Sequence, residues 1–128
     1  MNEQIKEMRL NFKEAEDFFI KRLAFTVDPI ELKELGEKEK IKIIDVRLKA
    51  DYEIGHIPNA ISIPEEELDK CLSELTKEET TIIYGYNYQC NLANKACLKL
   101  AQYGYPVMIL MGGFKSWTED FRFTTSKE

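Results

Sequence analysis

Cys90 stands at a position where a cysteine can become a reactive thiol. It lies near the end of a loop, between a predicted buried strand over residues 80–84 and a helix that starts after Asn91. In such a strand–loop–helix unit the loop N–H groups can point inward, with the positive end of the helix dipole behind them. This arrangement binds anions and favours the thiolate form of a cysteine. We therefore predict an anion-binding loop with Cys90 as its candidate nucleophile; the loop consists of Gly85, Tyr86, Asn87, Tyr88, Gln89, Cys90 and Asn91.

Cys90 can also be interpreted as a packing residue with no catalytic role. A cysteine at the helix end of a loop can turn under the helix and pack as a small apolar residue, which is the common role of a buried free thiol. The residues alone leave both interpretations open. A thiol that is accessible and faces the loop would favour the first.

Asp45 and Arg47 are a second pair of candidates. They end a predicted strand over residues 41–47 that is nearly continuous in apolar residues. Functional side chains of open α/β sheets gather at the carboxyl ends of the strands. An Asp–Arg pair can equally serve only to fasten the loop that follows, and the sequence gives the two roles equal weight.

Cysteine and histidine, the usual zinc ligands, are few in this sequence. Besides Cys90 there are two cysteines, Cys71 and Cys97, without a CxxC pair, and His56 is the single histidine. These numbers speak against a zinc site or a disulfide framework, and we expect neither a metal nor a cofactor. Cys71 is predicted to pack passively, and His56, between a glycine and a proline-containing turn, to hold that turn.

Composition limits the class of protein. The chain has 128 residues, 44% of them hydrophobic, which suits one domain with one core. Eighteen basic against 23 acidic residues give a net charge of −5, so nucleic acid is not an expected partner. No apolar run is long enough to span a bilayer, and the first residues do not follow the plan of a signal peptide. We expect a cytoplasmic protein with no membrane contact.

The hydrophobic pattern predicts an α/β fold. Five short apolar strands alternate with helices, which implies a parallel sheet covered on both faces; the strands are expected at 24–27, 41–47, 61–64, 80–84 and 107–110. Asp28 and Pro29 are typical of a helix start, with Gly36 expected to end that helix. Further helices are predicted at 1–22, at 65–75, from Asn91 as N-cap to Gly104, and from Lys115 onward.

Three parts are expected along the chain. Residues 1–24 form an amino-terminal helical extension packed on the domain, residues 25–122 form the domain itself, and residues 123–128 form a flexible tail. The helical extension has no function assigned by its sequence.

Four motifs, in this order and at these spacings, resemble the rhodanese-like domain family. They are 43–47 (IIDVR), 52–60 (YEIGHIPNA), 83–84 running into a loop and helix, and 111–117 (MGGFKSW). The resemblance covers roughly residues 25 to 120, about one domain. It implies a five-stranded parallel sheet with helices on both faces, and transfer of sulfane sulfur through a cysteine persulfide from donors such as thiosulfate to thiol or cyanide acceptors. A small sulfur-containing anion or a thiol acceptor is thus the implied partner.

The sequence departs from the family at the nucleophile. The family's cysteine directly follows the strand, where this chain has Gly85, and the usually small loop residues are here Tyr86, Tyr88 and Gln89. The resemblance also implies that Asp45 and Arg47 shape the loop and its electrostatics, and that His56 is mostly structural.

Two hypotheses follow from this departure. The first is a binding or regulatory module, with a protein as a further candidate partner and with weak or no thiosulfate sulfurtransferase activity because Gly85 replaces the nucleophile. The second is a persulfide carrier or sulfurtransferase that uses Cys90, since a subgroup of the family has a second cysteine just before an asparagine. A cysteine phosphatase is excluded, because the required arginine six residues after the nucleophile would fall on Ala96.

Overall fold

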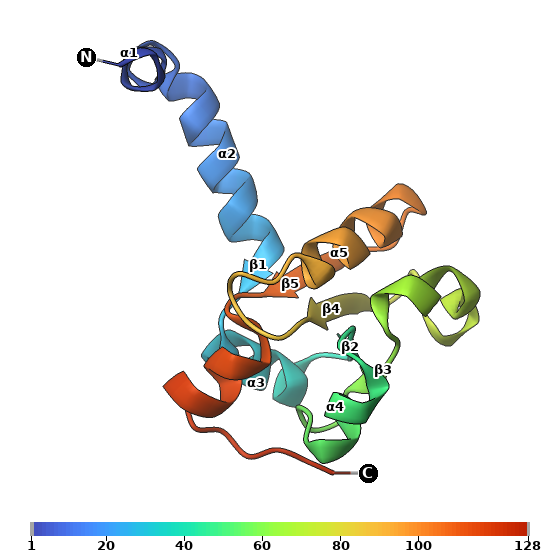
Figure 1. Cartoon of the computed structure of the whole chain (residues 1–128). Helices are drawn as coiled ribbons and strands as arrows, with labels where there is room; N and C mark the ends of the chain where they lie inside the picture. Colours follow the sequence, from blue (N-terminus) through green and yellow to red (C-terminus); the bar gives the residue numbers. More distant parts are fainter. Residues whose placement is uncertain (1, 128) are drawn as a thin grey trace.

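The computed structural model describes residues 2–127 and places a five-stranded parallel sheet at the centre of the protein. The strand order is β1-β5-β4-β2-β3 (Figure 1), and every pairing between these strands is parallel. The predicted fold class is therefore confirmed. The strands are β1 (Thr26–Val27), β2 (Ile41–Asp45), β3 (Ile61–Ser62), β4 (Thr80–Tyr84) and β5 (Val107–Leu110).

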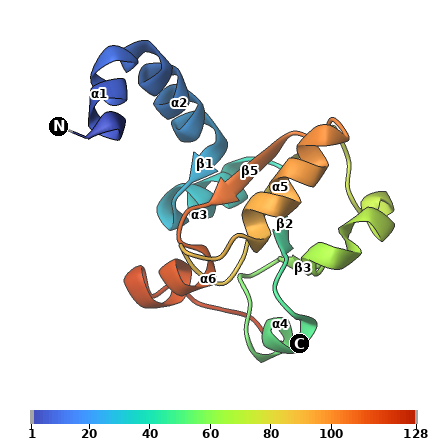
Figure 2. The same ribbon diagram turned by 45° about the horizontal axis from the view of Figure 1, so that its top comes forward.

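Helices cover both faces of the sheet because successive strand residues point to opposite sides. Ile43 and Ile82 belong to one apolar cluster and their neighbours Ile44 and Ile83 to the other. In Figure 2, α5 lies over one face, with α3 and α6 on the other side. The helical elements are α3 (Pro29–Lys38), α4 (Lys49–Ile54), α5 (Leu92–Gln102), α6 (Gly113–Lys115), the 3-10 turns η1 (Glu65–Lys70) and η2 (Leu72–Glu74), and the π-helical turn η3 (Ser116–Asp120).

α3 starts as the sequence predicts. The Asp28 side chain accepts from the Glu31 N–H at 2.8 Å, and the Glu31 side chain accepts from the Asp28 N–H at 3.2 Å, with Pro29 in the first turn. This is a capping box. The predicted end at Gly36 is wrong, since the helix continues to Lys38. A glycine inside an exposed helix costs only about 1 kcal/mol, which does not stop it.

α5 ends at Gly104 as predicted but is not capped at its start by the Asn91 side chain. Gly104 adopts φ +87°, and the N–H of Tyr105 donates to the carbonyl of Leu100 at 3.0 Å. This Schellman arrangement needs a residue that tolerates a left-handed backbone. Asn91 occupies the N-cap position with a helical backbone and forms no side-chain capping bond, because its φ and ψ differ from the extended values of a capping residue.

Two further helix predictions need correction. Residues 65–75 form η1 and η2 with a break at Cys71 in place of one α-helix, although Leu68 and Leu75 are buried as predicted. The strand predicted at 24–27 is reduced to β1, because Phe25 still belongs to the preceding helix.

The carboxyl-terminal segment, predicted as a flexible tail, is hydrogen-bonded to the domain. Ser126 pairs with His56 through two backbone hydrogen bonds of 2.8 and 2.9 Å. The Trp117 indole N–H also donates to the carbonyl of Thr124 at 2.9 Å. These bonds hold residues 124–126 against the domain; the last residue of the predicted tail, Glu128, lies outside the described part of the chain.

The amino-terminal extension, predicted to pack on the domain, consists of two helices, α1 (Glu3–Leu10) and α2 (Phe12–Phe25), and contacts the domain where α2 meets β1 and β5. Neither helix has a buried residue. Asn11, with φ −111° and ψ 40°, breaks the single helix that the pattern predicted. Figures 1 and 2 show α2 leaving the sheet at β1 and projecting from the body; Met1 of the predicted extension is outside the described residues. Across residues 2–127, no helix combines the length and hydrophobicity that crossing a membrane requires.

Candidate functional site

The two ends of the predicted anion-binding loop lie against each other. Gly85 is buried at the carboxyl end of β4, and Cys90 is half-buried before α5. A Cβ atom placed on Gly85 would lie 3.5 Å from Cys90 Sγ and 3.7 Å from the Cβ of Ala93. The sulfur of Cys90 therefore reaches the first residue after the strand, although it comes from the other end of the loop.

Asn87 closes the loop from inside. Its side-chain oxygen accepts from the Gln89 N–H at 3.0 Å, and its carbonyl accepts from the Cys90 N–H at 3.2 Å. These two N–H groups are used within the loop. These two N–H groups are therefore not free to point inward at an anion, because Asn87 forms a local turn with them.

The turn before α6 fixes the loop from the other side. The N–H of Phe114 donates to the carbonyl of Gly85, and the N–H of Lys115 donates to the carbonyl of Tyr86, both at 2.9 Å. Gly113 has φ +61°, and a Cβ there would lie 2.7 Å from the Gly85 carbonyl oxygen. Only glycine permits this close approach, so the motif at 111–117 positions the loop.

The large loop residues have different roles. Tyr86 holds the loop against α4, since its hydroxyl donates to the Asp51 carboxylate and accepts from the Leu48 N–H. Burial, followed by the hydrogen bond to Asp51, raises the pKa of Tyr86. Tyr88 is 71% exposed, and Gln89 is also exposed. Tyr86 thus occupies space beside the loop, while Tyr88 stands at its rim.

A small cavity of about 60 Å³ opens beside the Cys90 thiol. Since a cavity needs roughly 10–15 Å³ to hold one water molecule, this volume is enough for a few waters or a small anion. It is lined by Arg22, Thr26, Gly85, Asn87, Tyr88, Cys90, Ala93, Asn94 and residues 109–113. Four of the seven predicted loop residues reach this cavity, whereas Tyr86, Gln89 and Asn91 do not line it.

Arg22 is a lining residue that the sequence did not reveal. It lies on α2, more than sixty residues before the loop, and only the parallel pairing of β1 with β5 brings it to the cavity. An arginine among the lining residues of a small cavity favours anions over cations there. The sequence pattern around Arg22 showed only an amphipathic helix, which carries no signal for this placement.

Asp45 and Arg47 form a buried ion pair. Arg47 Nη2 donates to Asp45 Oδ2 at 2.7 Å, Nε donates to both carboxylate oxygens at 3.1 Å, and Nη2 also donates to the Gly55 carbonyl at 2.7 Å. The Tyr84 hydroxyl donates to Asp45 Oδ2 at 2.6 Å and accepts from the Ile57 N–H. The structure does not bring this cluster into the cavity of Cys90; its contacts fit the fastening role.

Burial and charge oppose each other at Arg47 and act together at Tyr84. Burial alone would lower the pKa of Arg47, but the hydrogen bonds and charge of Asp45 outweigh it and raise that pKa. Burial, and after it the Asp45 carboxylate, raise the pKa of Tyr84 far above its usual value. The guanidinium also lies 4.0 Å from the centre of the Phe114 ring, which follows the Gly113 turn. The ion pair therefore supports both sides of the loop without being exposed to a ligand.

The other cysteines and the histidine lie outside the cavity. Burial raises the pKa of Cys97 to about 12, and burial with the nearby Glu74 raises the pKa of Cys71. Both therefore stay as neutral thiols near pH 7. His56 is buried, stacks on Tyr52 at 3.8 Å between ring centres, and pairs with Ser126, so it holds the turn as predicted. No group of His, Cys, Asp and Glu side chains within residues 2–127 is arranged to hold a metal ion.

A family model and two proteins from other organisms match this chain. The family model described as Rhodanese-like domain matches residues 28–120. A protein named Sulfurtransferase from Allochromatium vinosum is 32% identical over 88 residues, which cover 65% of this chain and 77% of that protein. The HTH-type transcriptional regulator Rv0324 of Mycobacterium tuberculosis is 34% identical over 87 residues; the match covers 68% of this chain but only 38% of the regulator.

One solved structure resembles this protein over the sheet and beyond it. The BH2092 protein from Bacillus halodurans has 33% sequence identity and a TM-score of 0.82, over 91% of this chain and 87% of that one. A span of this size cannot fit within residues 28–128, so it includes part of the amino-terminal helices. On the family match, the sheet order and the motifs around the loop, this chain belongs to the rhodanese-like domain family.

Proposed function

We propose that this protein is a sulfur carrier that holds a persulfide on Cys90 and has little or no thiosulfate sulfurtransferase activity. The observation that carries the proposal is the position of Cys90 Sγ, 3.5 Å from where a side chain on Gly85 would begin. In rhodanese-like domains the nucleophile is expected at the residue that follows this strand. Cys90 presents a thiol to that place from the opposite end of the loop.

The sulfur-transfer step can be written for this thiol. The Cys90 thiolate attacks the terminal sulfur of a persulfide donor, R–S–SH. A new S–S bond forms on Cys90, the S–S bond of the donor breaks, and R–S⁻ leaves with the electron pair. A thiol acceptor reverses the step. This chemistry requires reduced cysteines, and we place it in the cytoplasm.

The cavity fits a small anionic donor. Arg22 is one of the residues that line the cavity, and the amino end of α5 adds the favourable end of its dipole. A persulfide or short polysulfide needs little room beyond its terminal sulfur. Thiosulfate carries three oxygens beside its sulfane sulfur and fits about 60 Å³ less readily.

A binding or regulatory module is the second candidate. Two of the loop N–H groups are used by Asn87, and Tyr88 stands at the rim, which both reduce anion binding. The relative from M. tuberculosis carries the name of a transcriptional regulator, although this chain spans only 38% of it. A protein that binds sulfur species without catalytic turnover, and responds to them, would combine the sulfur-carrier and regulatory functions.

We expect thiosulfate-to-cyanide transfer to be at least about a hundredfold slower than in a rhodanese with a cysteine after the strand. A reacting atom displaced by about 1 Å can cost that factor, and Cys90 Sγ comes from a different backbone position. Thiocyanate formation measures the rate, with Cys90→Ser as the control for the residual activity. A rate equal to that of an ordinary rhodanese would contradict the proposal, because it would need a fully placed nucleophile.

A further inference from the structure

The amino-terminal arm, defined as α1 and α2 (Glu3–Phe25), exposes most of its apolar side chains. Leu10 is 80% exposed, Leu23 76% and Phe12 69%. A single exposed apolar residue is ordinary, but a cluster of them on a projecting element marks an interaction site. The exposed large apolar residues of the arm are Ile5, Met8, Leu10, Phe12, Phe18, Phe19, Ile20, Leu23 and Phe25.

The exposed area is large enough for a stable interface. Four phenylalanines of the arm are 57–69% exposed. An aromatic side chain buries 150–250 Å² when fully covered, so these four leave on the order of 500 Å² in solvent. The aliphatic residues add a similar amount, so the arm as a whole exposes on the order of 1,000 Å² of apolar side chain over its several faces, comparable with the roughly 800 Å² per partner of a standard interface.

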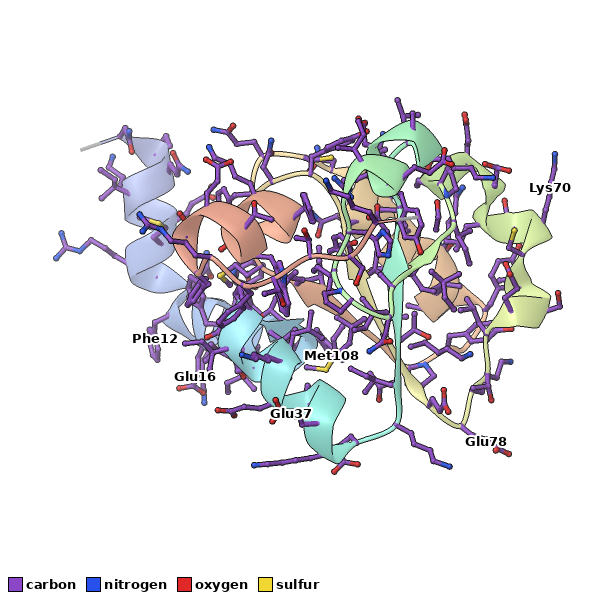
Figure 3. All side chains as sticks on the ribbon, turned by 90° about the horizontal axis from the view of Figure 1, so that it is seen from below. Phe12, Glu16, Glu37, Lys70, Glu78 and Met108 are labelled. Carbon is purple, nitrogen blue, oxygen red and sulfur yellow. The ribbon has the colours of Figure 1, made fainter. Side chains whose placement is uncertain are left out.

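The arm has two apolar faces. Phe18 and Phe25, with Arg22, face an apolar groove of about 410 Å³ between α2 and the body, lined also by α5 and β5 residues such as Leu98 and Met108. At 100° per residue, Phe12, Phe19 and Leu23 lie together on a different face of α2. Figure 3 shows Phe12 and Glu16 at the outer edge of the arm, away from Met108. We call the surface of Phe12, Phe19 and Leu23 the outer ridge.

We infer that the arm of one copy of this chain docks on the arm of a second copy, with each outer ridge in the groove of the other. Each copy offers one ridge and one groove, so a two-fold axis can pair each ridge with the partner's groove in two equivalent contacts, as an isologous dimer requires. Both surfaces are apolar, and interdigitated side chains of two helices bury apolar surface well.

Charge supports a second copy over other partners. The arm has as many acidic residues (Glu3, Glu7, Glu14, Glu16 and Asp17) as basic ones (Lys6, Arg9, Lys13, Lys21 and Arg22), whereas the whole chain carries −5. Because the arm is neutral, two arms do not repel each other. The same neutrality gives no attraction to an anionic membrane or to a strongly charged partner protein.

Sedimentation of the full-length protein over a range of micromolar concentrations tests this inference. The wild type is expected at twice 15.0 kDa. Phe19→Glu places a charge in the apolar contact and should raise the dimer dissociation constant at least about 30-fold, the effect of losing a central interface residue. Ile54→Glu is the matched control, because Ile54 is 71% exposed on α4; it should stay dimeric.

Two outcomes would overturn the inference. One is a wild-type protein that sediments as a monomer throughout, whether or not it binds phosphatidylcholine vesicles. The other is equal dissociation by Phe19→Glu and Ile54→Glu, which would make the association unspecific. Circular dichroism of both variants verifies that they are folded. None of these measurements depends on Cys90, so they are independent of the sulfur-carrier proposal.

Discussion

Moving the thiol from residue 90 to residue 85 is expected to give a protein that still accepts sulfur. Gly85→Cys in a Cys90→Ser background should gain the mass of one sulfur atom on the peptide that contains residue 85 after incubation with polysulfide. Cys90→Ser alone should gain none. The position tolerates a side chain, because Gly85 does not have a positive φ and its Cβ would have no contact shorter than 3.5 Å.

The single variant Gly85→Cys gives a second readout. The Cβ of residue 85 would lie 3.5 Å from Cys90 Sγ. A mild oxidant should therefore link the introduced thiol to Cys90, provided that the loop keeps its geometry. Both variants should melt within about 5 °C of the wild type. An unfolded variant would show that Gly85 is needed for its backbone. A folded double variant that stays inert to polysulfide would show that the loop admits no sulfur donor, and the binding module would then be the better explanation.

Replacing Asp45 with asparagine is expected to destabilise the fold by about 3–5 kcal/mol. Removing one partner of a buried ion pair leaves an uncompensated charge, here the guanidinium of Arg47, without access to water. Asp45 is fully buried and also accepts from the Tyr84 hydroxyl. Since a domain of this size has only about 5–15 kcal/mol of stability, this variant should unfold at much lower urea concentration.

Two controls bracket that effect. Tyr84→Phe keeps the ion pair and removes one hydroxyl, so a smaller loss of about 1–3 kcal/mol is expected. Glu16→Gln changes an exposed carboxylate beside Lys13 and should leave the urea midpoint unchanged. If Asp45→Asn were as stable as Glu16→Gln, the cluster would not be the fastening of the loop.

The sequence predicted the elements whose signals are local. The strands at 80–84 and 107–110, the helix start at Asp28 and Pro29 and the end of α5 at Gly104 follow from residues within a few positions of each other. The order of the motifs then pointed to the family and the fold.

Features that depend on contacts across the fold were not predictable in this way. The approach of Gly113 to the Gly85 carbonyl and the placement of Arg22 at the cavity both join segments that are distant along the chain. The amphipathic pattern of α2 correctly indicated a helix. It did not indicate what covers the apolar residues, because an apolar face can equally await a second molecule.

The candidate site, like the fold, was predictable from the sequence only in part. The sequence located the loop and its thiol but left open whether Cys90 turns toward the loop or under the helix. In the structure Cys90 lines the cavity beside the loop, and its role as nucleophile is our proposal. For Asp45 and Arg47 it shows a closed network in place of an exposed pair, because neighbouring Tyr84 and Gly55 complete their hydrogen bonds.

The most direct test of the account is the mass of the cysteine-containing peptides after the reduced protein meets inorganic polysulfide. We expect one added sulfur atom on the peptide of Cys90, removed again by excess thiol, and none on that of Cys97, whose pKa burial raises to about 12. Cys90→Ser should abolish the gain. Absence of sulfur on Cys90, or equal loading of Cys90 and Cys97, would contradict the account.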